Sequence, residues 1–115
     1  MKILIAEHLN SEYNLLKDYL NEQYILYRAL DGEDAVFIFF KGMQDIIFID
    51  LMMPKVNSYE ATDAIRQIST SVFIVAIADL AEKEKINFFL KGFNAFLSLP
   101  INKKQLFDIL KTSGT

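Results

Sequence analysis

Short apolar runs alternate along the chain with stretches in which apolar residues recur every three or four positions. Such runs fit strands buried on both faces, and the longer spacing fits amphipathic helices. The runs predict strands at residues 3–6, 24–29, 46–49, 72–77 and 95–97. The periodic stretches predict helices at residues 11–22, 32–41, 58–68, 80–91 and 102–111. Gly42 and Gly92 are expected to end the second and fourth of these helices.

This alternation of strands and helices decides the fold class. Each connection between strands is too long for a hairpin, so right-handed crossovers and a parallel sheet follow. We predict a doubly wound, flavodoxin-like α/β fold, with a five-stranded parallel sheet in the order 2-1-3-4-5 and five helices. No linker or repeat interrupts the pattern, so residues 1–115 are expected to form one domain, with any output domain elsewhere.

Composition narrows the classes of function. The net charge of −3 argues against a surface dedicated to nucleic acid or to an anionic membrane. With no Cys and one His, disulfides, thiolate metal sites and a cysteine nucleophile are excluded. The longest apolar stretch, residues 72–78, is much shorter than the roughly 18 residues that span a bilayer. The N-terminus lacks a signal peptide, so a cytoplasmic protein is expected.

Two acids mark the expected site. In sheets of this kind ligands bind beyond the carboxyl ends of the strands, where Glu7 and Asp50 follow the first and third predicted strands. These strands would be neighbours, and converging acids there suit a divalent cation held by oxygen ligands. The alternative is that the acids only cap strand ends at the solvent edge.

Nucleotide-binding loops are missing from the sequence. The four glycines form neither a G-x-G-x-x-G nor a G-x-x-x-x-G-K-[ST] pattern. The first strand is followed by Glu7, His8 and Leu9, where a bound phosphate would need small residues and free backbone N–H groups. A dinucleotide-binding enzyme or a flavodoxin proper is therefore not indicated.

Three segments, residues 2–7, 46–54 and 96–101, carry a resemblance to a known family in their order and spacing. The most specific segment reads DLMMP at 50–54, a D-x-x-M-P pattern, and NSYE follows it at 57–60 at the family spacing. Over nearly its whole length the chain resembles the response-regulator receiver domain.

The resemblance implies a role for each matching residue. Asp50 stands at the phosphoacceptor position, which takes a phosphoryl group from the phosphohistidine of a histidine kinase or phosphotransfer protein. Glu7 matches the first acid of the family's metal-binding pair, and the backbone carbonyl of Met52 matches its main-chain metal ligand. The implied metal is Mg²⁺, which neutralises charge on the transferring phosphoryl oxygens.

The second acid of that pair, normally Asp, is His8 in this chain. Mg²⁺ prefers oxygen ligands and near-ideal octahedral geometry, whereas imidazole suits zinc, copper or nickel. The affinity for Mg²⁺ should therefore fall. Two interpretations of His8 stay open, a side chain at the solvent edge without a ligand, and a transition-metal site shared with Glu7 and Asp50.

Further departures affect the groups that hold the phosphoryl group. Leu99 replaces the family Lys, Ala78 replaces the switch Ser or Thr, and Phe96 stands at the aromatic switch position without the hydroxyl of a Tyr. The lost charge-assisted hydrogen bond is worth roughly 1.5 to 3 kcal/mol, and the lost hydroxyl bond roughly 0.5 to 1.5 kcal/mol. Together they amount to about two to three orders of magnitude in phosphoryl stabilisation or transfer.

The leading hypothesis is a degenerate receiver, or pseudo-receiver, that acts through protein–protein contacts with weak or no phosphorylation and is not an enzyme. The alternatives are a working Mg²⁺-dependent phosphoacceptor and, from another class, a small-ligand-binding α/β domain. Two apolar clusters, residues 37–40 and 88–90, are candidate contact surfaces for a kinase, phosphotransfer or other signalling protein. The region from the fourth helix to the fifth is also a candidate surface for a homodimer.

Overall fold

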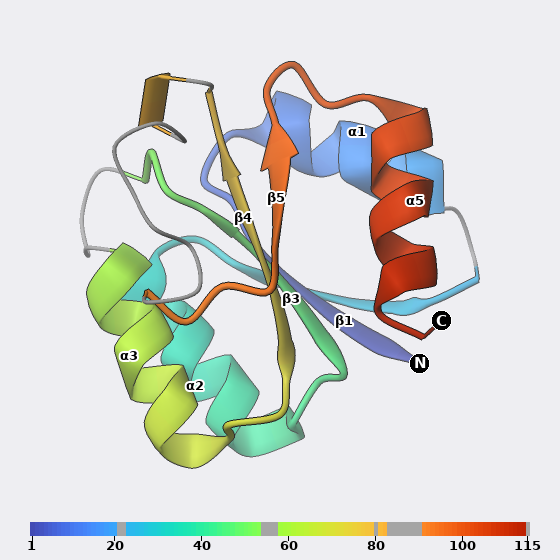
Figure 1. The fold of residues 1–115 in the computed structure, drawn as a ribbon. Coiled ribbons are helices and arrows are strands. Elements are labelled where there is room, and N and C mark those ends of the chain that lie inside the picture. The colour runs from blue at the N-terminus through green and yellow to red at the C-terminus, as the bar shows by residue number, and fades with distance from the viewer. Residues whose placement is uncertain (21–22, 54–57, 80, 83–90, 115) are drawn as a thin grey trace.

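Five parallel strands form one sheet in the order β2-β1-β3-β4-β5, as the sequence predicts (Figure 1). This computed structural model describes residues 1–20, 23–53, 58–79, 81–82 and 91–114. The strands are β1 (Lys2–Ala6), β2 (Ile25–Ala29), β3 (Ile46–Asp50), β4 (Phe73–Ala78) and β5 (Ala95–Ser98). No end of a strand differs from its predicted position by more than one residue.

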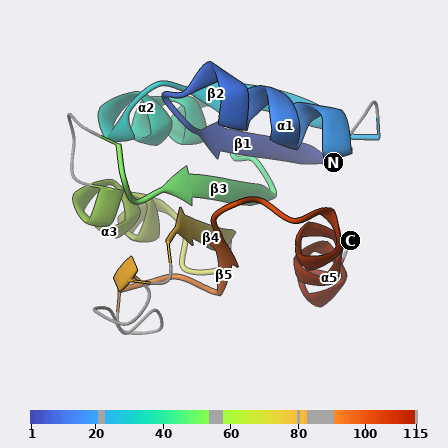
Figure 2. The same cartoon turned by 90° about the horizontal axis from the view of Figure 1, so that it is seen from above.

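Helices cover both faces of the sheet. They are α1 (Asn10–Leu20), α2 (Gly32–Gly42), α3 (Ser58–Ile68) and α5 (Lys103–Thr112). Figure 2 shows α1 and α5 against one face and α2 and α3 against the other. The described residues contain four helices, whereas the sequence predicted five. Most of the helix predicted at residues 80–91, with the apolar cluster 88–90, lies outside the described residues. No helix in the described ranges is long and apolar enough to cross a membrane.

The core has two layers because the central strands are buried on both sides. One layer packs under α2 and α3 and includes Phe39 and Ile47, and the other packs under α1 and α5 and includes Leu16 and Phe48. Apolar side chains on both faces explain why these strands read as continuous apolar runs rather than alternating ones.

The two glycines expected to end helices differ in backbone conformation. Gly92 has a positive φ of 91°, and most of the helix that it was expected to end lies outside the described residues. At the end of α2, however, the left-handed residue is Met43, with φ 46°. A Cβ at Gly42 would meet the side-chain amide of Gln44, which would have to shift.

Candidate functional site

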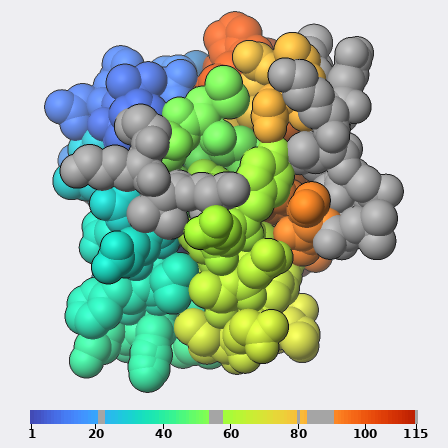
Figure 3. Space-filling view, turned by 90° about the vertical axis from the view of Figure 1, so that its left-hand side faces the viewer, coloured from blue at the N-terminus to red at the C-terminus, as the bar shows by residue number. Residues whose placement is uncertain are grey.

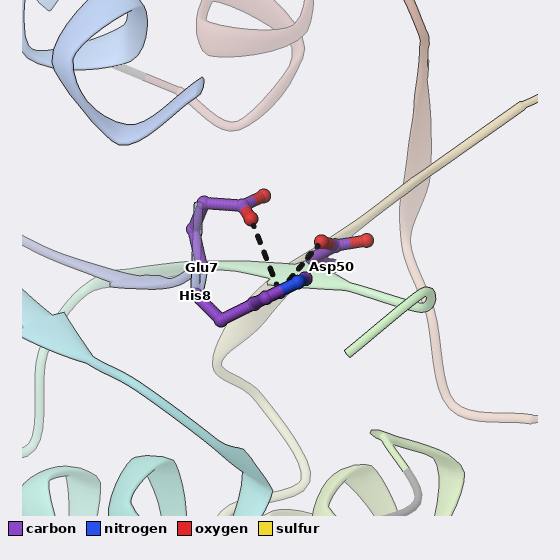
Figure 4. A group of neighbouring side chains, drawn as sticks. All are labelled: Glu7, His8 and Asp50. Carbon is purple, nitrogen blue, oxygen red and sulfur yellow. Dashed lines mark ion pairs between the residues drawn. The ribbon is translucent and has the colours of Figure 1, made fainter. Parts of the chain in front are cut away.

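The register of the sheet brings Glu7 and Asp50 together. Ala6 pairs with Ile49 across β1 and β3, so the residues that follow and end these strands emerge side by side at the carboxyl edge (Figure 4). Their side chains are buried, with 0% of Glu7 and 1% of Asp50 exposed. The acids therefore converge as predicted, and they are buried rather than exposed at the solvent edge.

Asp50 is held through its side chain and its backbone. Its Oδ1 accepts a hydrogen bond of 2.8 Å from the Met52 backbone N–H, and its carbonyl accepts one of 2.6 Å from the hydroxyl of Ser58. Ser58 is the first residue of α3 and is itself buried. These bonds orient Asp50 from both the loop after β3 and the start of α3.

Glu7 has one bonded oxygen and one without a partner. Oε1 accepts a 3.0 Å hydrogen bond from the Leu9 backbone N–H, whereas Oε2 is buried with no hydrogen-bond partner among the described residues. Burial raises the pKa of Glu7 from 4.5 to about 9, helped by the nearby carboxyl groups of Asp50 and Glu12 and opposed by the Leu9 bond. A proton or another cation at this carboxylate is thereby favoured.

His8 points its ring nitrogen into the site. Nδ1 lies 3.5 Å from Oε1 of Glu7 and 3.7 Å from Oδ2 of Asp50, as the dashed lines in Figure 4 mark. The side chain is 29% exposed, yet Nδ1 itself is buried and has no hydrogen-bond partner among the described residues. Both distances are longer than an ordinary N–H···O bond. His8 is therefore a member of the cluster rather than a side chain turned to solvent.

The ends of β4 and β5 form the other half of the edge. Ala78 is fully buried and offers no hydroxyl, and the Leu99 backbone N–H donates to its carbonyl at 2.9 Å. Leu99 is half-buried, and Phe96 packs inward against the core layer under α2 and α3. In the described part of the chain, the ion pairs of Glu7 and Asp50 are both with His8.

Two residues at the site were missed from the sequence. Ser58 was considered as a helix start and not as a partner of Asp50. Arg28, on β2, donates from Nε to the Glu7 carbonyl at 3.1 Å and stacks 4.4 Å above the Tyr13 ring. A charged residue within an apolar strand was the available signal for Arg28.

The donor atoms can be compared with the needs of a metal. Glu7, His8 and Asp50 offer two carboxylate oxygens and one imidazole nitrogen within 4.8 Å of one another. Two negative charges suit a divalent cation, but Mg²⁺ prefers oxygen and the third donor is nitrogen. The set therefore does not match an all-oxygen Mg²⁺ site. The exposed side chain of Met52 takes no part in this cluster, and the metal role of its carbonyl stays a prediction.

An apolar groove runs between α2 and α3, on the face that Figure 3 presents. Phe37 and Phe40 line it and are 60% and 59% exposed, whereas Phe39 is buried in the core. Consecutive residues of a helix point in different directions, so these rings cannot all reach the sheet. The groove encloses about 640 Å³ and is also lined by Ile68 of α3.

Comparison with known proteins gives consistent matches. The profile of the response regulator receiver domain family matches residues 3–111. Hybrid signal transduction histidine kinase I of Dictyostelium discoideum is 30% identical over 122 residues, which cover 96% of this chain and 7% of that protein. This chain thus spans a small part of that relative's length.

Two solved structures are similar in fold. The receiver domain of a Pseudomonas aeruginosa sensor histidine kinase, with magnesium coordinated in its active site cleft, has 26% identity and a TM-score of 0.88 over 99% of this chain and 98% of that one. A chain in the co-crystal structure of the Saccharomyces cerevisiae phosphotransfer protein Ypd1 with the receiver domain of Ssk1 has 26% identity and a TM-score of 0.87, covering 99% of this chain and 88% of that one.

Proposed function

The chain belongs to the family of response regulator receiver domains, and on that premise we propose that it is a receiver whose phosphorylation site is eroded. The family places it in two-component or phosphorelay signal transduction. In this proposal Asp50 occupies the phosphoacceptor position, phosphorylation is weak or absent, and the domain acts mainly through protein–protein contacts rather than as an enzyme.

The observation that best supports an eroded phosphorylation site is the chemistry of the residues at the ends of β4 and β5. A phosphoryl group on Asp50 brings negative charge, which needs donors or cations around it. Ala78 has no hydroxyl and Leu99 has no charge at the two positions that the family uses. The two positions that should hold the phosphoryl oxygens therefore carry only apolar side chains.

The reaction at Asp50 would form a bond from a carboxylate oxygen to phosphorus as the bond to the donor's leaving group breaks. The Met52 N–H already donates to Oδ1, so Oδ2 is the oxygen for attack. Oδ2 faces His8 at 3.7 Å, and the imidazole occupies space that a smaller family acid would leave open. This crowding adds to the lack of phosphoryl ligands.

Partners follow from the family and from the surface. Partners of this class are histidine kinases and phosphotransfer proteins, such as the one in the yeast complex. The groove between α2 and α3, with Phe37 and Phe40 exposed, supports a role in protein contacts. A homodimer through the region from residue 80 to α5 remains a part of the proposal, and direct contact with nucleic acid or membrane is not.

The test is the intact mass of the protein after incubation with acetyl phosphate and Mg²⁺. We expect little or no phosphoryl adduct over the time in which a conventional receiver treated in parallel is fully labelled. Asp50→Asn is the control, because it keeps an oxygen that can accept from the Met52 N–H. An adduct that forms on the wild type and is lost in Asp50→Asn would support the alternative, a working phosphoacceptor.

A further inference from the structure

We propose that Glu7, His8 and Asp50 form a site for a transition-metal dication of the zinc or cobalt type, in preference to Mg²⁺. This inference deepens the proposed function, because it concerns the same edge of the sheet. It does not require phosphoryl transfer to occur or to fail.

The distances between the donor atoms fit a shared metal better than direct bonds. His8 Nδ1 lies 3.5 Å and 3.7 Å from the two carboxylates. Two ligands of one tetrahedral zinc ion, each roughly 2.0 to 2.2 Å from the metal, lie roughly 3.3 to 3.6 Å apart. The three donor atoms lie within 4.8 Å of one another, so a closing movement of up to about 1 Å would place all of them within reach of one ion.

Unpartnered buried atoms provide a second, independent observation. Glu7 is fully buried, and its Oε2 has no hydrogen-bond partner among the described residues. His8 Nδ1 is also buried without a hydrogen bond in the described part of the chain. Buried polar atoms are normally paired, so a buried ring nitrogen that faces two carboxylates without a hydrogen bond indicates a missing ligand. A metal ion held by His8 Nδ1 and by one oxygen of each acid would pair this nitrogen and neutralise the two carboxylates.

The choice of metal follows from the nitrogen donor. Imidazole binds zinc, cobalt, nickel and copper well, and carboxylates are accepted by the same ions. Mg²⁺ gives up water reluctantly and takes oxygen ligands, so replacing one acid by His8 removes its preferred donor. Three side-chain ligands leave room for water or another ligand, as in sites that are not closed by the protein.

The chain offers a clean readout, since His8 is its single histidine. We would titrate tag-free protein with Zn²⁺, and separately with Mg²⁺, and follow the imidazole nitrogens by NMR. We expect Zn²⁺ to shift the Nδ1 resonance and Mg²⁺ to leave it in place. Calorimetry should give an affinity for Zn²⁺ at least 100-fold higher than for Mg²⁺.

His8→Asp restores the family acid and is the decisive variant. We expect it to lower the affinity for Zn²⁺ at least tenfold and to raise the affinity for Mg²⁺. Asp108→Asn is the matched control, since it removes an exposed carboxylate that pairs with Lys104 outside the site and should change neither affinity. Circular dichroism of each variant checks that the fold is kept.

Three results would overturn the inference: no binding of Zn²⁺, equal affinities for the two metals, or unchanged selectivity in folded His8→Asp. The metal titration contains no phosphodonor, so its outcome is separate from the labelling test. A protein that binds Zn²⁺ and is also labelled at Asp50 contradicts only the eroded phosphorylation site. A protein that does neither contradicts only the metal site.

Discussion

The two halves of the carboxyl edge of the sheet share a backbone design and differ in chemistry. The acidic half, at the ends of β1 and β3, carries the buried carboxylates of Glu7 and Asp50. The apolar half, at the ends of β4 and β5, carries Ala78 and Leu99. The backbone ladder continues through both halves, with Leu51 N–H bonded to the Ile77 carbonyl at 2.8 Å and Leu99 N–H bonded to the Ala78 carbonyl at 2.9 Å. The same kind of backbone hydrogen bond is therefore made in both halves, although their side chains differ.

The two halves also differ in their effect on the stability of the fold. Buried carboxylates lose hydration and repel one another, so the acidic half lowers the stability of the metal-free fold. The apolar half carries no such penalty, because Ala78 and Leu99 leave no polar side-chain atom to be satisfied. Retained acids in an otherwise apolar edge are more easily explained by a ligand than by folding.

We expect the largest effect, on the rate of phosphorylation of Asp50, from restoring the family residues in the apolar half. Ala78→Ser with Leu99→Lys supplies the hydroxyl and the cation that this half lacks. We expect the rate of labelling of Asp50 by acetyl phosphate to rise by roughly two to three orders of magnitude, since hydrogen bonds to a charged group act in the transition state. The measurement is a time course of the intact mass.

Two controls accompany this restored variant. Leu99→Met with Ala78→Ser changes the same positions without adding charge and should give a small part of the gain. Adding Asp50→Asn to the restored variant should abolish the label. If the restored protein is labelled no faster than the wild type, the apolar half does not limit the reaction, and His8 or the acidic half does.

Much of the fold follows from the sequence because it depends on periodicity. Apolar runs and helical spacing predicted the strands, and the flavodoxin-like order expected for such an alternation predicted the meeting of Glu7 with Asp50. The end of α2 was placed one residue early, since the left-handed residue that ends it is Met43 and not a glycine.

The inward direction of His8 could not be predicted, because a residue just after a strand can turn either way. Ser58 and Arg28 were missed for a related reason. Their bonds to the Asp50 and Glu7 carbonyls join different elements, and such bonds depend on the packing of α3 and β2 against the sheet edge. Contacts of this kind have no short-range pattern in a sequence.

We expect an intermediate effect of pH on the free energy of unfolding, which arises from the acidic half. The pKa of Glu7 is raised from 4.5 to about 9 by burial. The folded state therefore binds more protons between these values than the unfolded state, and its stability falls as pH rises through them. From about pH 5.5 to about pH 8.5, we expect the metal-free protein to lose on the order of 4 kcal/mol in free energy of unfolding.

Urea unfolding followed by circular dichroism, with a chelator present, measures this dependence. Glu7→Gln removes the titrating group and should flatten the slope, leaving the variant more stable than the wild type at the higher pH. Glu33→Gln, at an exposed position of α2, should keep the wild-type slope. Equal slopes for Glu7→Gln and the wild type would show that the acidic half carries no buried charge penalty.

We expect the smallest effect, on the free energy of unfolding, from removing the hydrogen bond that joins the acidic half to α3. Ser58→Ala removes a buried hydroxyl that donates to the Asp50 carbonyl at 2.6 Å. Loss of one such bond should lower the free energy of unfolding by about 1 kcal/mol, measured by urea unfolding. Thr112→Ala removes an exposed hydroxyl that donates to the Asp108 carbonyl at 3.1 Å, where water can replace it, so a change within about 0.5 kcal/mol is expected. If Ser58→Ala is as stable as the wild type, the sheet alone positions Asp50, and both halves of the edge are held by the same backbone ladder.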